Sequence, residues 1–134
     1  MQSFPINWLA LLVVTVVKFV LGFVWFGLIF GKQWQALSGV SEAAMKAGMV
    51  KAIVTDLVTT FILAFVLVHA IHYAGAASLG TGAAVGFFNW LGFVGTLTLA
   101  STVYEQRPLK LWVIGNAYQL LSLVIMGAVL AIWT

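Results

Sequence analysis

The few residues of this sequence that could do chemistry stand inside long apolar stretches. Lys18 interrupts the first stretch and Asp56 the second. A charged side chain at the centre of a membrane-spanning helix costs about 2.5–3.5 kcal/mol on insertion scales, and such residues commonly mark proton, ion or substrate sites. We expect the charged and polar residues at this depth to form one candidate intramembrane cluster, whose members are Lys18, Asp56, Thr60, Asn89, Thr98, Asn116 and Gln119.

Three interpretations of Lys18 are open. Its aliphatic stem could carry the ammonium group to a lipid headgroup or a water pocket. It could instead form a structural contact, either an ion pair with Asp56 or a hydrogen bond to Asn89, or it could act directly on a substrate or a proton. At about 1.5 Å per helical residue, Lys18 and Asp56 are offset by about 9 Å along the membrane normal, which a lysine side chain can partly close. We place structural pairing of Asp56 ahead of a direct functional role.

Asn116 and Gln119 are three residues apart, so they share one face of a helix, and Tyr118 points away from both. Counting residues from the ends of the spans places Asn116 at the depth of Asp56, with Thr98 close by. Amides in a bilayer need hydrogen-bond partners, and a bond between helices contributes about 0.6 kcal/mol and seldom more than about 2. We therefore interpret the two amides as contacts between helices more readily than as a ligand site.

His69 and His72 also share a helical face and could in principle hold a metal ion. No carboxylate or third histidine stands near them in the sequence, so interfacial hydrogen bonding or a pH-sensitive contact is the preferred interpretation. The chain contains no Cys, which excludes disulfides, thiolate metal sites and Cys nucleophiles. It also lacks a Ser-His-Asp elbow and a phosphate-binding loop. We therefore predict that the protein is not an enzyme and binds no cofactor or metal.

The elements that must position these residues are membrane-spanning helices. Hydrophobic residues make up 63% of the 134 residues and charged residues 7%, whereas about 25% of a soluble domain is charged. The mean hydropathy is +1.14. We predict a single all-α domain over residues 1–134, a bundle of four transmembrane helices, with a short interfacial helix from Glu42 to Ala47 capped by Ser41. The spans are expected at about residues 7–30, 50–73, 81–103 and 109–133.

The basic residues of the connections predict the orientation of the bundle. The first connection and its flank carry three lysines and the third connection carries one Arg and one Lys, whereas the N-terminus, the second connection and the C-terminus have neither. By the positive-inside rule, the first and third connections face the cytoplasm and both termini lie outside it. The formal net charge is only +3, and we interpret it as a signal of membrane orientation. We therefore expect the lipid bilayer as a partner and no nucleic acid. The basic residues concerned are Lys32, Lys46, Lys51, Arg107 and Lys110.

Small residues four positions apart predict close packing of helices, because they let two backbones approach each other. Three pairs that contain glycine stand out, namely Gly27 with Gly31, Gly82 with Gly86, and Gly127 with Ala131. The third span has two small faces, as is typical of a central helix or of a helix that also packs against another subunit. These Gly-rich faces make a homo-oligomer a second expected partner.

Five motifs in the chain resemble those of one family: GFVWFG at 22–27, FGKQW at 30–34, WLGFV at 90–94, RPLKLW at 107–112 and MGAVL at 126–130. In combination they are similar to the bacterial domain of unknown function 1761 family, over nearly the whole chain. The resemblance implies a small four-helix membrane protein and brings no established activity, so no catalytic residue is carried over.

We therefore expect an integral protein of the bacterial inner membrane with a structural or regulatory role and no catalysis. The alternative is a small oligomeric transporter or channel, in which the charged and amide side chains surround a hydrated cavity. Closed pairing of these side chains would favour the first interpretation, and a cavity connected to solvent would favour the second.

Overall fold

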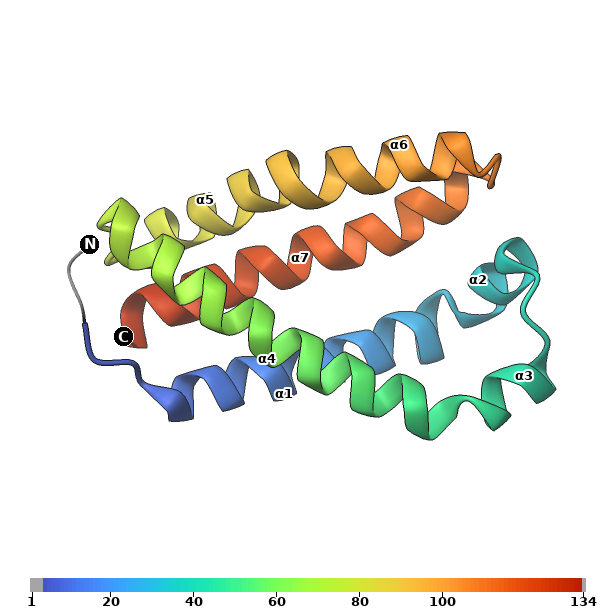
Figure 1. Cartoon of the computed structure of the whole chain (residues 1–134), viewed down its shortest axis with the longest axis horizontal. Helices are drawn as coiled ribbons and strands as arrows, with labels where there is room; N and C mark the ends of the chain where they lie inside the picture. The colour runs from blue at the N-terminus through green and yellow to red at the C-terminus, as the bar shows by residue number, and fades with distance from the viewer. Residues whose placement is uncertain (1–3, 134) are drawn as a thin grey trace.

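The computed structural model describes residues 4–133, which fold into helices joined by short connections (Figure 1). Two of the long helices contain a π-helical stretch, at Val24–Ile29 after α1 and at Trp90–Gly95 between α5 and α6. The α-helices are α1 Trp8–Phe23, α2 Gly31–Ser38, α3 Glu42–Ala47, α4 Met49–Ala74, α5 Leu79–Asn89, α6 Thr96–Tyr104 and α7 Leu109–Trp133.

Four continuous helices of the described chain are long and apolar enough to cross a membrane, with 22, 26, 26 and 25 residues. At a rise of about 1.5 Å per residue, each exceeds the roughly 30 Å of a hydrocarbon core. Each of these four helices begins and ends within two residues of the range expected for its span. The predicted all-α membrane bundle is confirmed. The four helices are Trp8–Ile29, Met49–Ala74, Leu79–Tyr104 and Leu109–Trp133.

The first connection contains one expected and one unexpected helix. The expected helix, α3, begins where the Ser41 side chain accepts a hydrogen bond from the backbone of Ala44 at 3.1 Å. The unexpected helix is α2, which ends at Gly39 with a left-handed φ of 74°. A left-handed residue after the last turn is a common helix end, and glycine adopts it without a steric penalty. The sequence predicted only the helix from Glu42 to Ala47 in this connection.

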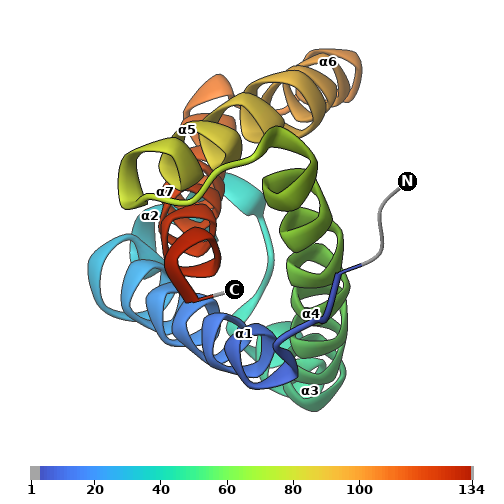
Figure 2. The same ribbon diagram turned by 90° about the vertical axis from the view of Figure 1, so that its left-hand side faces the viewer.

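The fourth span, α7, is the central helix. It contacts α1, α4 and α5, and the view along the bundle shows it lying between them (Figure 2). Within the most apolar part of α7, 44% of the residues are buried, whereas the corresponding value for the third span is 11%. The third span therefore lies at the periphery, and a central position does not explain its small faces.

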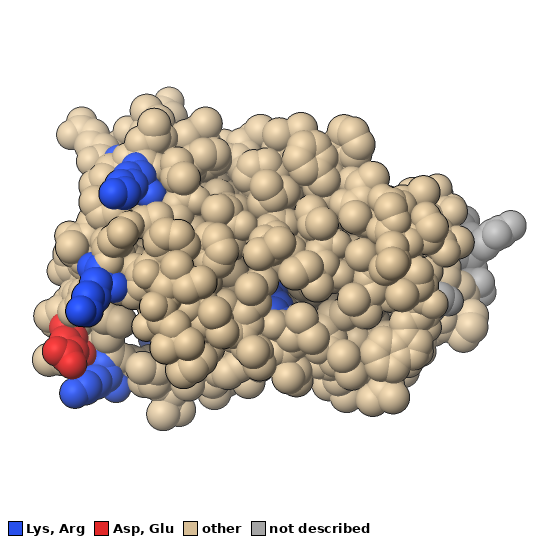
Figure 3. Space-filling view, turned by 180° about the vertical axis from the view of Figure 1, so that it is seen from behind, with Lys and Arg blue, Asp and Glu red and all other residues tan. Residues whose placement is uncertain are grey.

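The two ends of the bundle differ in charge. What we call the terminal end contains residues 4–7, the turn at 75–78 and the end of α7 (Figure 1). What we call the basic end contains α2, α3 and the turn at 105–108, and Figure 3 shows the exposed Lys and Arg side chains gathered at one end of the molecule. The buried apolar core lies in the terminal half. Its residues are Ala10, Leu11, Val14, Ala64, Leu67, Val68, Ile71, Leu123, Met126, Leu130 and Ala131.

Backbone-to-backbone packing joins α5 to α7. A Cβ added at Gly82 would overlap the carbonyl oxygen of Gly127, and one added at Gly86 would overlap the carbonyl oxygen of Leu123. Ala131 also lies against Gly82. Two of the three small-residue pairs expected from the sequence therefore pack against each other inside one chain.

This packing predicts that Gly127→Ala destabilises the protein by about 1–3 kcal/mol, because the added methyl group forces α5 and α7 apart. The matched control is Gly115→Ala on the same helix, where an added Cβ meets no atom within 4 Å. Unfolding in detergent, followed by circular dichroism, measures both changes. Equal unfolding midpoints for the two variants would contradict the close approach of α5 and α7.

Candidate functional site

The central feature of the site is Lys18, whose side chain is 5% exposed. Its Nζ donates a hydrogen bond to the Tyr118 hydroxyl oxygen at 3.1 Å, and that hydroxyl donates to the Lys18 backbone carbonyl at 3.1 Å. The same Nζ lies 3.7 Å from Oδ1 of Asp56. The charge of Lys18 is thus held by a carboxylate on α4 and a phenol on α7, and three spans meet at this point.

A glycine makes room for this contact. Gly22 follows Lys18 by four residues, so both lie on one face of the first span. A Cβ at Gly22 would lie 2.8 Å from the Tyr118 hydroxyl oxygen. The Tyr118 ring therefore reaches the α1 backbone only because position 22 has no side chain.

Asp56 is the exposed residue of the site. Its side chain is 40% exposed, although it belongs to the third turn of a membrane-spanning helix. Its carboxylate accepts no hydrogen bond within residues 4–133, and its 3.7 Å contact with Lys18 is too long for one. Thr60, one turn further along α4, is 3% exposed, and its hydroxyl likewise makes no hydrogen bond within that range.

A second polar group forms around Asn116 on another face of α7. Asn116 Oδ1 accepts from the Trp90 indole at 3.3 Å and lies 3.1 Å from the Thr98 hydroxyl. Trp112 closes the group, since its indole donates to Thr98 Oγ1 at 3.0 Å and its carbonyl accepts from Asn116 Nδ2 at 3.3 Å. We call these four residues the Asn116 group. It ties the third span to α7.

Both π-helical stretches carry a tryptophan that binds α7. Trp25 donates from its indole to the carbonyl of Ile114 at 3.0 Å, and Trp90 donates to Asn116. A π-helical turn inserts one extra residue and rotates the side chains around it, and such turns are frequent at functional sites. The sequence did not predict these two hydrogen bonds.

The expected cluster of seven residues is therefore divided in the structure. Lys18, Asp56 and Thr60 lie at the junction of α1, α4 and α7, whereas Thr98 and Asn116 belong to the Asn116 group. Asn89 donates only to the carbonyl of Val85, four residues earlier, at 2.8 Å, so the considered bond between Lys18 and Asn89 is not formed. Gln119 is half-buried and makes no side-chain hydrogen bond within residues 4–133.

Tyr118 is the site residue that sequence reasoning missed. It does point away from Asn116, as expected, and that direction brings it to Lys18. Two signals in the sequence could have found it, namely a phenol at the depth of the buried lysine and a glycine one turn after that lysine.

The histidines lie at the terminal end and hold the chain before α1. Phe4 stacks on His72 with ring centroids 3.7 Å apart, and it lies 5.0 Å from the ring of His69. His69 Nδ1 is 2.7 Å from the Phe65 carbonyl oxygen. Among the described residues, no group of three His, Cys, Asp or Glu side chains could hold a metal ion.

Four apolar spans, with charged and amide side chains bonded between them, define an integral membrane protein of the helical-bundle class. Residues 9–131 match the family described as "Protein of unknown function (DUF1761)". The chain belongs to this family, as its motifs indicated. No curated protein and no solved structure matches the chain.

The geometry predicts that Tyr118→Phe lowers stability by about 0.6–2 kcal/mol. The variant loses the hydroxyl that forms hydrogen bonds with the Lys18 ammonium group and with the Lys18 backbone carbonyl. Tyr104→Phe is the matched control, since Tyr104 is 90% exposed. Thermal unfolding in detergent compares the two variants. If Tyr118→Phe unfolds at the same temperature as Tyr104→Phe, the phenol does not stabilise the buried charge.

Proposed function

We propose that this protein is a non-catalytic component of the bacterial inner membrane with a structural or regulatory role. In this role, the charged and amide side chains inside the bundle fix the arrangement of the helices and do not act on a substrate. The observation that carries the proposal is the reciprocal pair of hydrogen bonds between Lys18 and Tyr118, which uses the buried ammonium group within the chain.

The Asn116 group supports the same conclusion. Its indole, hydroxyl and amide groups bond to one another across the third span and α7. A substrate pathway needs polar groups that face a hydrated space and can exchange partners. The groups around Asn116 are instead occupied by each other, as expected of contacts that determine helix packing.

One observation favours transport as a second candidate. The Asp56 carboxylate is 40% exposed and accepts no hydrogen bond within residues 4–133. An ionisable group at this depth marks an ion or proton pathway in many membrane proteins. A small oligomeric transporter or channel would use Asp56 together with Lys18.

Flux measurements decide between the two candidates. For the structural role, we expect purified protein in sealed vesicles to carry protons, Na⁺ and K⁺ no faster than protein-free vesicles under an applied gradient. Fluorescent indicators trapped inside the vesicles report each ion. A flux that requires the protein and disappears in Asp56→Asn would replace the structural role by transport.

We further propose that the basic end faces the cytoplasm and that both termini lie outside it. Five Lys and Arg residues flank the connections of the basic end, and the sequence around the other end has none. Fusions of alkaline phosphatase to the C-terminus should be active, because this enzyme folds only outside the cytoplasm, and fusions of a fluorescent protein after residue 106 should be bright. The opposite pattern would invert the proposed orientation.

A homo-oligomer is also part of this proposal. Gly82 and Gly86 of α5 and Gly127 of α7 are already used inside the chain, so we place the face for a second copy on the outer side of the third span. An added Cβ at Gly92 meets no atom within 4 Å, and the neighbouring Phe88 and Phe93 are exposed. Small residues flanked by large apolar ones suit close contact between helices in a bilayer.

A further inference from the structure

The buried core of the protein ends at the level of Lys18 and Thr60. On the first span no described residue beyond Lys18 is buried, and on α4 no residue before Thr60 is buried. In Figure 1, α4 crosses the bundle from beside α5 at the terminal end to α3 at the basic end. In its first three turns, α4 is therefore packed less closely on the bundle than in its second half.

We call the region beside these first turns of α4, next to Lys18, the opening. Its surface carries hydrogen-bonding groups that are not fully used. The Lys18 ammonium group has three N–H donors, and one of them is used by Tyr118. The Asp56 carboxylate and the Thr60 hydroxyl have no hydrogen bond within residues 4–133. Thr60 is exceptional in this respect, because other threonines of the spans donate to the carbonyl four residues earlier, namely Thr15, Thr55, Thr59, Thr96, Thr98 and Thr102.

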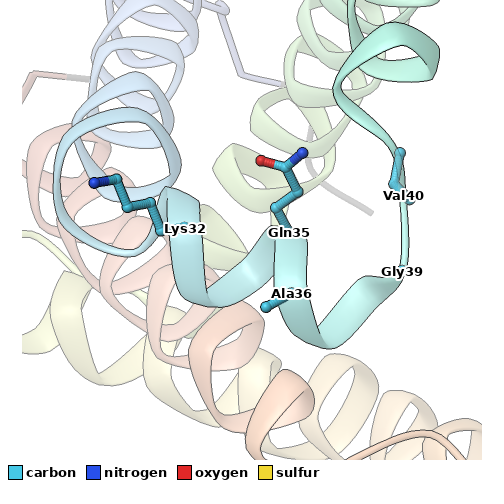
Figure 4. A pocket seen from close by; sticks show the side chains of 5 residues that line it. All are labelled: Lys32, Gln35, Ala36, Gly39 and Val40. Atoms are coloured by element: carbon cyan, nitrogen blue, oxygen red, sulfur yellow. The ribbon is translucent and has the colours of Figure 1, made fainter.

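The basic end itself carries a hollow. There, a pocket of about 460 Å³ is lined by α2 and the turn after it (Figure 4). Two of its lining residues are polar, and in the close view Lys32 and Gln35 leave α2 in different directions. The α2 helix packs on α7 and the α3 helix on α4, so the turn that joins them runs from the side of α7 to the side of α4 at the basic end.

We propose that this opening is a water-filled crevice that runs from the basic end, along the face of α4 that carries Asp56, to Thr60. Its ligand is water, which bridges the Lys18 ammonium group, the Asp56 carboxylate and the Thr60 hydroxyl. A buried water needs two to four polar partners, and these three groups supply them. Acyl chains in the same space would leave a half-exposed carboxylate without a hydrogen bond, which is far more costly than hydration.

A cavity connected to solvent favours transport only where it crosses the bundle, so a crevice open at one end leaves the proposed structural role standing. A hydrated Asp56 is compatible with a bundle that carries no flux, since the core in the terminal half closes the path. It is also independent of orientation, because the crevice is defined by the basic end and not by a compartment. Inverting the topology would only change which compartment supplies the water.

The chain has no Cys, so a single introduced thiol can report the presence of water at one position. Leu57 and Val58 are adjacent on α4 and lie at almost the same depth. Leu57 is half-buried beside Asp56, whereas Val58 is exposed on the outer side of the helix. Leu57→Cys and Val58→Cys keep the pair of Lys18 and Asp56 intact, and size-exclusion chromatography confirms that each variant is folded.

A charged, membrane-impermeant thiosulfonate, added to oriented vesicles, is the probe. We expect Leu57→Cys to react at least about tenfold faster than Val58→Cys, and only from the side of the basic end, because the reactive thiolate forms in water. A lipid-soluble maleimide should modify both variants, which shows that both thiols are present. Equal and slow reaction of the two variants with the charged probe, or reaction from the terminal end, would overturn the crevice.

Discussion

Burial of the Lys18 charge is the constraint on which the rest of the structure depends. An ammonium group in the middle of a membrane-spanning helix needs a counter-charge and hydrogen-bond acceptors. The counter-charge comes from Asp56 on α4, and an acceptor comes from Tyr118 on α7. Three of the four spans must therefore meet at one level. The glycine at position 22 is part of the same constraint, because any side chain there would push the phenol away from α1.

This junction also divides the bundle into two unlike halves. Toward the terminal end, α1, α4 and α7 enclose an apolar core. Toward the basic end, α1 and α4 have no buried residue, and α7 is held instead by Trp25 and by the Asn116 group. Packing thus dominates in the terminal half, whereas the basic half combines specific hydrogen bonds with the buried apolar residues Leu111 and Ile114 of α7. Such a division places Asp56 at the boundary between a dry region and an open one.

Much of the fold was predictable, because hydropathy and helix length are local properties of the chain. The four spans, the Ser41 cap and the family followed from residue order alone. The site was predicted only in part. The pairing of Lys18 with Asp56 was one of three interpretations, whereas Tyr118 was missed, since a helical face can be computed from spacing but the helix opposite it cannot. The π-helical turns at Trp25 and Trp90 change that spacing, so the hydrogen bonds of these two tryptophans to α7 could not be predicted from it.

The sequence by itself determined that the chain has four apolar spans, that a charge of each sign lies within them, and which connections carry the basic residues. Composition and order suffice for these features, because each depends on the transfer of a residue or a short segment between water and hydrocarbon. Only the tertiary structure decided that α7 is central, that Gly82 and Gly86 face Gly127, and that Lys18 lies between Asp56 and Tyr118. These features depend on contacts between residues up to 100 positions apart, and such contacts arise from the mutual fit of whole helices.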